Sequence, residues 1–269
     1  MADRFHKMHG LGNDFVVIDA REHPVAMTKT RAQAIANRHT GIGCDQLILL
    51  EPSTTADAKM RTWNADGSEV EICGNATRAV ALLLGEPAIL ETIGGPVSVF
   101  PHDGDATVDM GAPRFNWDAI PLAYAMDTSA LPVGWETLEN PAVVNVGNPH
   151  IIFFVDDAAG VDLARLGPII EHDPLFPDRI NVNVASITGL SALTLRVWER
   201  GAGLTLACGT GACATAVAAI RSKRAVSPVI VSLPGGDLTI AWAPGETIRM
   251  TGPATHVFTG ETDWDRFGR

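Results

Sequence analysis

Hydrophobic and polar residues along the first half of the chain are spaced as in short strands with two helices between them. This spacing predicts strands within residues 5–19, 46–50, 59–63 and 89–110, and helices at 28–39 and 80–84. Turn residues separate these elements, including the segment Gly10 to Asp14 and the pair Asp66-Gly67, which is typical of a tight hairpin. The first half is therefore expected to consist mostly of antiparallel strands.

The second half shows the same order of elements after a proline-rich crossing at residues 113–141. Its spacing predicts strands at 151–155, 180–184, 193–197, 229–242 and 247–258, with helices at 161–170 and after Cys208. The pattern predicts an α+β fold of two pseudo-symmetric halves, each a mostly antiparallel sheet wrapped around a central helix.

Several residues recur at a fixed offset of 135 positions. The matching pairs are Gly12-Asn13 with Gly147-Asn148, Gln46 with the other amide Asn181, Trp63 with Trp198, Cys73-Gly74 with Cys208-Gly209, and Ala79 with Ala214. Chance identity is the alternative, because most other positions do not match. An offset that needs no gaps favours an internal duplication, with two half-chains that face each other.

Cys73 and Cys208 each open an apolar helical run. At a helix N-terminus the unpaired N–H groups and the helix dipole favour a thiolate and bind anions. If the halves face each other, N–H groups of Gly74-Asn75 and Gly209-Thr210 could hold a carboxylate and place its α-carbon between the two sulfurs. One thiolate could then remove the α-proton while the other thiol protonates the opposite face, as in a two-base racemase.

The composition is that of an ordinary globular protein. The chain has 269 residues and 46% hydrophobic residues, which is enough for two cores of moderate size. A net charge of −11 without runs of Lys or Arg argues against nucleic acid or an anionic membrane surface as a partner. Because the first residues form no apolar segment and no stretch approaches 18 apolar residues, we expect a cytoplasmic location.

The cysteine and lysine positions indicate neither a metal site nor a bound cofactor. None of the four cysteines forms a CxxC pair, so free thiols and no metal are expected, with Cys44 and Cys213 as small buried hydrophobes. None of the four lysines lies in a recognisable pyridoxal setting. A Cys/His hydrolase would leave the second cysteine unexplained.

Four motifs resemble the diaminopimelate epimerase family, in order and over essentially the whole chain. They are Lys7-Met8-His9-Gly10-Leu11-Gly12-Asn13-Asp14-Phe15, Asn64-Ala65-Asp66-Gly67-Ser68-Glu69 through Cys73-Gly74-Asn75, Gly147-Asn148-Pro149-His150, and Glu199-Arg200-Gly201 through Ala207-Cys208-Gly209-Thr210-Gly211-Ala212-Cys213. The resemblance implies a cofactor-independent epimerase that interconverts LL- and meso-2,6-diaminopimelate, on the route to lysine and peptidoglycan. It also implies a homodimer and an active site in the cleft between two domains, residues 1–116 and 117–258, with 259–269 returning to the first.

The family's functional positions carry over residue by residue. Cys73 and Cys208 match the acid/base pair, and His150 and Glu199 match residues that tune the thiols. The positions that match substrate-binding residues are Asn13, Gln46, Asn64, Gly74, Asn75, Asn148, Asn181, Glu199, Arg200, Gly209 and Thr210. Arg200 could clamp the far carboxylate of diaminopimelate, and Glu199 could pair with its ammonium group. Without the resemblance, Glu199 beside Arg200 would be read as a surface ion pair, and His150 as an ordinary residue at a strand start.

Four positions depart from the commonest family pattern. Ala76 stands in place of Gly, Ala79 in place of Cys, Leu204 in place of Glu, and Phe258 where several members have a Tyr at the dimer contact. None of these positions holds either thiol of the pair. The departures therefore bear on the usual hydrogen bond of the dimer, not on the chemistry.

Two other functions remain open at this point. A proline or hydroxyproline racemase-like enzyme of the same fold would share the paired cysteines, but its substrate has no far end and so no need for Glu199 and Arg200. A non-catalytic amino-acid-binding protein would need neither thiol.

Overall fold

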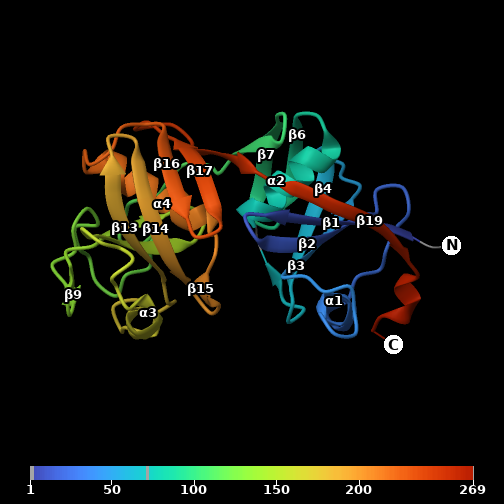
Figure 1. Cartoon of the computed structure of the whole chain (residues 1–269), viewed down its shortest axis with the longest axis horizontal. Coiled ribbons are helices and arrows are strands. Elements are labelled where there is room, and N and C mark those ends of the chain that lie inside the picture. The colour runs from blue at the N-terminus through green and yellow to red at the C-terminus, as the bar shows by residue number, and fades with distance from the viewer. Residues whose placement is uncertain (1–2, 71–72, 269) are drawn as a thin grey trace. The chain divides into compact units, whose positions relative to one another are not determined.

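A computed structural model of the chain describes residues 3–70 and 73–268 (Figure 1). The chain folds into two compact units, which we call the N-terminal unit (Met1–Val108 with Gly252–Arg269) and the central unit (Asp109–Thr251). These boundaries differ from the 116 and 259 expected from the sequence. The second boundary moves because strand β19 (Thr255–Thr262) pairs along its length with β1 (Asp3–Gly10), so all of β19 belongs to the N-terminal unit.

The sheet of the N-terminal unit is mostly antiparallel. Besides β1 and β19 its strands are β2 (Asn13–Asp19), β3 (Gln46–Glu51), β4 (Ala58–Asn64), β5 (Glu69–Val70), β6 (Ala88–Thr92), β7 (Gly95–Pro101) and β8 (Asp105–Asp109). Parallel pairing joins β2 to β3 and β4 to β6, and the other pairs are antiparallel. The residues of β3 between its two ends, Leu47 to Leu50, are completely buried.

Helix α2 (Gly74–Leu84) is the buried helix of this unit and packs against β1, β2, β7 and β19 (Figure 1). Its residues from Gly74 to Ala81 are buried, and most are small, so strands can approach closely. The helix ends at Gly85, which takes the left-handed conformation (φ 74°) that glycine tolerates best.

Helix α1 (Lys29–Ala36) is shorter than the predicted helix at 28–39. Thr28 caps its start, because the Thr28 side chain accepts the N–H of Arg31. Asn37 leaves the helical conformation, and its side chain accepts the N–H groups of His39 and Thr40 instead. The asparagine thus ends the helix through the local hydrogen bonds that make this residue unfavourable inside helices.

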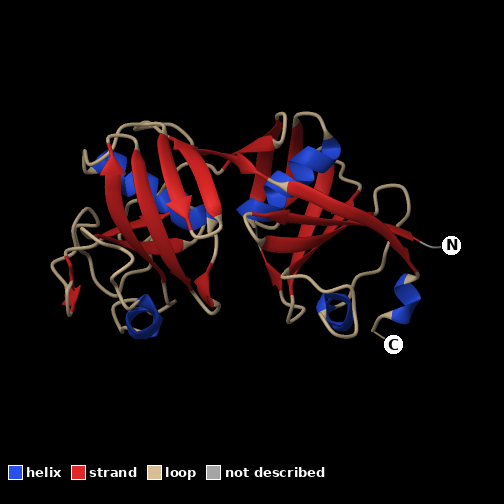
Figure 2. Ribbon diagram, in the orientation of Figure 1, coloured by secondary structure: helices blue, strands red, loops and turns tan. Residues whose placement is uncertain are grey.

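The central unit repeats the arrangement around helix α4 (Gly209–Arg221), and in both units strands are more extensive than helices (Figure 2). Its strands are β9 (Gly134–Trp135), β10 (Leu138–Glu139), β11 (Ala142–Asn145), β12 (Pro149–Phe154), β13 (Asn181–Gly189), β14 (Ala192–Glu199), β15 (Gly203–Thr205), β16 (Val229–Leu233), β17 (Gly236–Ala241) and β18 (Arg249–Pro253). Parallel pairing joins β12 to β13 and β14 to β16. Helix α3 (Leu163–Glu171) packs on β13, β14 and β15. A short 3-10 helix (Trp264–Arg266) follows β19 and belongs to the N-terminal unit.

The duplication is present in the hydrogen-bond register of the two sheets. In the N-terminal unit Phe15 pairs with Gln46, and Leu47 pairs with Trp63. In the central unit the residues 135 positions later, His150 with Asn181 and Val182 with Trp198, are paired in the same way. The predicted α+β fold of two pseudo-symmetric halves is confirmed.

In the described part of the chain, every helix is too short or too polar to cross a membrane.

Candidate active site

Cys73 occupies the N-cap of α2, with the extended backbone angles φ −128° and ψ 108°. The carbonyl oxygen of Cys73 accepts both the N–H and the hydroxyl of Thr77, each at 2.9 Å. Its thiol is half-buried and lies 3.8 Å from the side-chain oxygen of Asn13. The helix start thus carries a thiol beside the N–H groups of Gly74 and Asn75, in a first turn where such groups lack helical partners.

Asn13 is fixed from two sides. Its amide nitrogen donates to Asp45 (3.1 Å), and its oxygen accepts from the amide nitrogen of Asn75 (3.2 Å). Asp45 in turn accepts from Arg38 at 2.7 Å. The side chain of Asn13 therefore connects strand β2 to the first turn of α2. It brings together three residues that the sequence predicts for the site, Asn13, Cys73 and Asn75.

Gln46 and Asn64 are register partners on β3 and β4, and their side chains are joined. The amide nitrogen of Gln46 donates to the oxygen of Asn64 at 3.2 Å, and Asn64 donates to Ser68 at 3.3 Å. The side-chain oxygen of Gln46 is buried and accepts no hydrogen bond from the described residues. A buried oxygen that accepts no hydrogen bond from the protein is suited to accept one from an N–H or O–H group of a bound ligand.

Cys208 occupies the N-cap of α4 with almost the same backbone angles, φ −128° and ψ 109°. Its sulfur accepts the N–H of Gly211 at 3.3 Å and lies 3.5 Å from the hydroxyl of Thr210. Burial raises the pKa of the Cys208 thiol well above its ordinary value, and the negative charge of Glu199 raises it further. Both effects favour the protonated form of the Cys208 thiol.

Glu199 ends strand β14 and accepts the hydroxyl of Thr205 at 2.6 Å. Burial raises the pKa of its carboxyl group, although hydrogen bonds from Thr205 and Cys208 oppose this shift. Glu199 and Cys208 thus influence each other, because the charge of Glu199 raises the pKa of the thiol and a hydrogen bond from Cys208 lowers that of the carboxyl group.

Arg200 and Glu199 take different partners and do not form the surface ion pair considered above. The exposed Arg200 guanidinium donates to the carbonyl oxygen of Asp178, and its backbone N–H donates to the side chain of Asn181, both at 2.9 Å. Glu171, whose side chain is buried, holds the same turn because it accepts the N–H of Gly201 at 3.0 Å. The turn that carries the two charged residues is therefore fixed by buried polar groups.

His150 is completely buried between two asparagines. Its Nδ1 atom lies 3.0 Å from the amide nitrogen of Asn183 and must accept from it, so Nε2 carries the proton and donates to the oxygen of Asn148 at 2.9 Å. Burial lowers the pKa of His150 to about 3. The imidazole is therefore neutral at working pH, and within this unit its two nitrogens contact asparagines.

Asn183 contacts the predicted site residue His150 and was not predicted from the sequence. It lies two positions after Asn181 on β13, hence on the same face of the sheet. Its buried oxygen has no hydrogen-bond partner in the described chain, and a Cβ atom added to Gly211 would lie 2.8 Å from that oxygen. The sequence did carry a signal, because Asn181 and Asn183 are two positions apart in a predicted strand and so share one face of the sheet.

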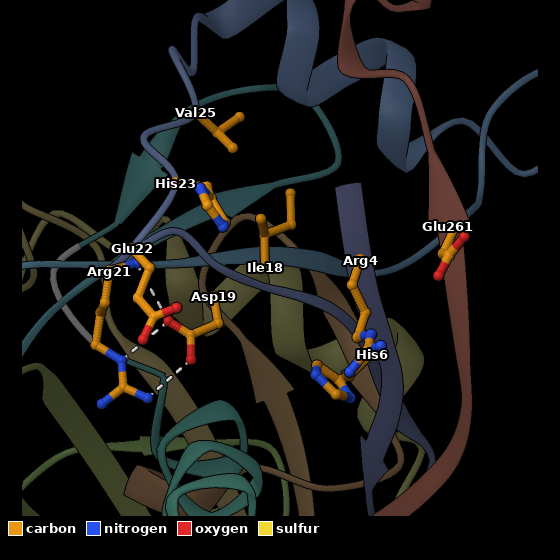
Figure 3. A pocket seen from close by; sticks show the side chains of 9 residues that line it. All are labelled: Arg4, His6, Ile18, Asp19, Arg21, Glu22, His23, Val25 and Glu261. Carbon is orange, nitrogen blue, oxygen red and sulfur yellow. Dashed lines mark hydrogen bonds and ion pairs between the residues drawn. The ribbon is translucent and has the colours of Figure 1, made fainter. Parts of the chain in front are cut away.

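A cavity of about 650 Å³ lies elsewhere in the N-terminal unit (Figure 3). Its lining includes Arg4, His6, and Arg21 with its ion-pair partner Asp19, but none of the predicted substrate-binding residues. This cavity is therefore separate from the residues that the sequence predicts for the site. Among residues 3–70 and 73–268, no three His, Cys, Asp or Glu side chains are grouped in a way that could hold a metal ion.

Replacing Glu199 with glutamine is expected to make Cys208 easier to alkylate. The change removes the negative charge that raises the pKa of the thiol while keeping a side-chain oxygen for Thr205, so more thiolate forms at a given pH. We expect iodoacetamide at pH 8 to modify Cys208 about fivefold faster, as measured by peptide mass spectrometry. Glu246→Gln, at an exposed glutamate, is the matched control. An unchanged or slower alkylation rate in Glu199→Gln would contradict the conclusion that the charge of Glu199 raises the pKa of Cys208.

Comparison with known proteins identifies the family. The family model described as "Diaminopimelate epimerase" matches residues 5–116 and 142–257. The chain belongs to the diaminopimelate epimerase family. Proteins named diaminopimelate epimerase from Sphingopyxis alaskensis and Rhizorhabdus wittichii are 68% and 66% identical to it, over 100% of this chain and 100% and 98% of theirs. The predicted family is thus confirmed.

Solved structures with low sequence identity share the fold. A phenazine biosynthesis protein of the PhzF family from Enterococcus faecalis aligns with a TM-score of 0.70 at 15% identity, over 98% of this chain and 100% of that one. A hydroxyproline epimerase from Agrobacterium vitis aligns with a TM-score of 0.66 at 15% identity, over 97% and 92%. At such identities the likeness concerns the fold alone.

Proposed function

We propose that this protein is a cofactor-independent diaminopimelate epimerase, which interconverts LL- and meso-2,6-diaminopimelate. The observation that carries the proposal is the pair of cysteine N-caps, Cys73 and Cys208, at equivalent positions of a duplicated fold and with the same backbone angles. One thiol at each of two equivalent helix starts is what proton transfer on opposite faces of one carbon requires.

The reaction needs one thiolate and one thiol. The carboxylate next to the reacting carbon binds the N–H groups at the helix starts, Gly74-Asn75 and Gly209-Thr210, which stabilise the enolate-like charge that develops on it. The thiolate accepts the α-proton, and the opposite thiol donates its proton to the other face of the carbon. After one turnover the two sulfurs have exchanged protonation states, and the reverse reaction restores them.

The far end of the substrate carries a second carboxylate and a second ammonium group. We assign the carboxylate to Arg200, whose exposed guanidinium can form two parallel bonds with it. The buried oxygen of Gln46 and the amides of Asn13, Asn64 and Asn148 are suited to neutral contacts with the substrate. Asn181 and Glu199 complete the set, Asn181 through the turn that it holds and Glu199 as a partner for the ammonium or for the Cys208 proton.

The thiol-tuning role expected for His150 takes a specific form in this proposal. A neutral imidazole cannot supply positive charge to a thiolate, so His150 acts by orienting Asn148. Glu199 then remains as the charged group that, after burial, raises the pKa of Cys208.

The proposal is tested by incubating reduced protein, free of pyridoxal phosphate, with LL-diaminopimelate in D2O. We expect NMR to show loss of the α-proton signal together with formation of the meso isomer, with deuterium at the product α-carbon. If folded protein with free thiols gives no exchange, the proposal is wrong. Exchange of proline or hydroxyproline instead would identify a racemase of that type, and binding of an amino acid without exchange would identify a non-catalytic binding protein.

The same proposal includes a homodimer in the cytoplasm that supplies lysine and peptidoglycan synthesis. Two exposed apolar side chains on β19, Val257 and Phe258, support association of two copies. Phe258 also packs edge-on against Phe5, so its ring is held in place. A reducing compartment keeps both catalytic thiols free, which supports the cytoplasmic location. The net charge of −11 supports a small-molecule substrate and no nucleic-acid partner.

A further inference from the structure

Arg78 is a completely buried arginine in helix α2, one turn after the helix start. Its Nη2 atom donates to the side-chain oxygen of Asn75 at 2.9 Å, and its Nε atom donates to the carbonyl oxygen of Pro253 at 3.4 Å. Nothing in the mechanism above uses this residue. Burying a guanidinium is costly, so its retention in the core calls for a physical explanation.

The hydrogen-bond polarity of Arg78 determines how Asn75 is oriented. A guanidinium has only donors, so the group of Asn75 that faces it must be the oxygen. The amide nitrogen of Asn75 is then directed to Asn13, where it donates to the side-chain oxygen at 3.2 Å. A residue able both to donate and to accept at position 78 would no longer require the oxygen of Asn75 to face it.

Asp45 fixes the opposite end of this chain of hydrogen bonds. Its ionised carboxylate has only acceptors, so Asn13 must present its amide nitrogen there, as it does at 3.1 Å. All donors in the series Arg78, Asn75, Asn13 and Asp45 therefore point the same way. The oxygen of Asn13 is left facing Cys73, 3.8 Å from its sulfur.

We propose that Arg78 is a positioning residue for Cys73, acting through Asn75 to hold the oxygen of Asn13 beside the thiol. The catalytic role of Cys73 rests on the proposed function, whereas the positioning concerns the protein alone. Arg78 is itself held by tight packing, since a Cβ atom added to Gly10 would lie 3.3 Å from its Nη2 atom and 3.3 Å from the carbonyl oxygen of Asn75.

The second half of the duplication has no such arginine. The position equivalent to Arg78 in α4 is the buried Cys213, and the one equivalent to Asn13 is Asn148. The oxygen of Asn148 lies 2.9 Å from His150, and the sulfur of Cys208 instead accepts the N–H of Gly211. The two helix starts have almost the same backbone angles, but Cys208 lacks the Asn13-type contact of Cys73, and the second half has Thr210 and Cys213 where the first has Asn75 and Arg78.

The experiment is a double-mutant cycle that needs no substrate. Rate constants for alkylation of Cys73 by iodoacetamide at pH 7.5 are measured by peptide mass spectrometry for the wild type, Arg78→Gln, Asn75→Ala and the double variant. If Arg78 acts through Asn75, each single change alters the alkylation rate severalfold, and the double variant reacts at the same rate as Asn75→Ala. Its rate then differs fivefold or more from the product of the two single effects. Glutamine is chosen because it is a good helix former that both donates and accepts.

An outcome in which the two effects multiply to within twofold would overturn the proposal, because Arg78 would then act on Cys73 without Asn75. Cys213→Ala combined with Asn75→Ala is the matched control, and its effects are expected to multiply. Should Arg78→Gln fail to fold, Arg78→Lys replaces it. Lysine also has only donors, so Cys73 reactivity is expected within twofold of wild type, and a change as large as that of Asn75→Ala would refute the role.

The epimerase assay in D2O is run in parallel on the same samples. If the wild type epimerises diaminopimelate but Arg78→Gln and Asn75→Ala show no coupling in the alkylation of Cys73, only the positioning role is refuted. Coupling without epimerisation in the wild type would refute the proposed function alone.

Discussion

Replacing either Cys73 or Cys208 with serine lowers kcat for epimerisation of diaminopimelate by about 10³-fold, within the range that general acid–base groups contribute. A serine hydroxyl is a much weaker acid than a thiol, so at neutral pH it cannot supply the anion that removes the α-proton. The change replaces sulfur with oxygen and keeps a small side chain at the N-cap, where serine is a favoured residue. The loss therefore reflects chemistry and not folding, which circular dichroism and the melting temperature verify.

The remaining thiol gives this prediction a second readout. Because each sulfur serves one face of the carbon, each single variant is expected to exchange the α-proton of at most one of the two diastereomers in D2O without converting it to the other. Cys44→Ala and Cys213→Ala serve as controls at buried cysteines, and burial raises the pKa of Cys44 to about 12. If either serine variant keeps more than a tenth of wild-type kcat, the two-base mechanism is excluded.

Changing Arg200 to methionine lowers kcat/KM for diaminopimelate by about 10²- to 10³-fold, which is the usual cost of removing one member of a charge-assisted pair. The variant keeps the backbone N–H that donates to Asn181, so the turn is retained while the guanidinium is lost. Steady-state kinetics with diaminopimelate measure the effect. The same substitution at Arg165, an exposed arginine paired with Glu136, is the control.

Arg200→Met also separates the two enzyme hypotheses. A proline-type substrate has no second amino-acid head, so its turnover is expected to change little. Retention of more than a third of wild-type kcat/KM with diaminopimelate would mean that another group binds the far carboxylate.

The fold could be predicted from the sequence because two independent patterns agreed. Apolar spacing located the strands, and the offset of 135 positions reappears in the pairings of Gln46 and Asn181. The predicted end of α1 was wrong because the helix was extended to the break at Gly41, whereas the side chain of Asn37 hydrogen-bonds to the backbone and stops the helix earlier. Local hydrogen bonds of this kind end a helix before a glycine does.

The candidate site was predictable in part, for a physical reason. Residue types and helix starts indicated Cys73 and Cys208 and the chemistry open to them. The position of Asp45 against Asn13 was not predictable, because it depends on which strands become neighbours in the sheet. Arg78 was missed because an arginine in a helical run normally indicates a solvated face, whereas here the whole first two turns of α2 are buried.

The discontinuity of the N-terminal unit has a consequence for how the chain folds as it is synthesised. The central unit is one continuous segment, Asp109–Thr251, and is complete once Thr251 has left the ribosome. The N-terminal unit lacks β19 until residues 255–262 are made, so β1 stays with one edge uncovered although it was synthesised first. The second half of the molecule can thus become native before the first, and truncation near the C-terminus would damage the fold around residue 10 and not the segment next to the cut.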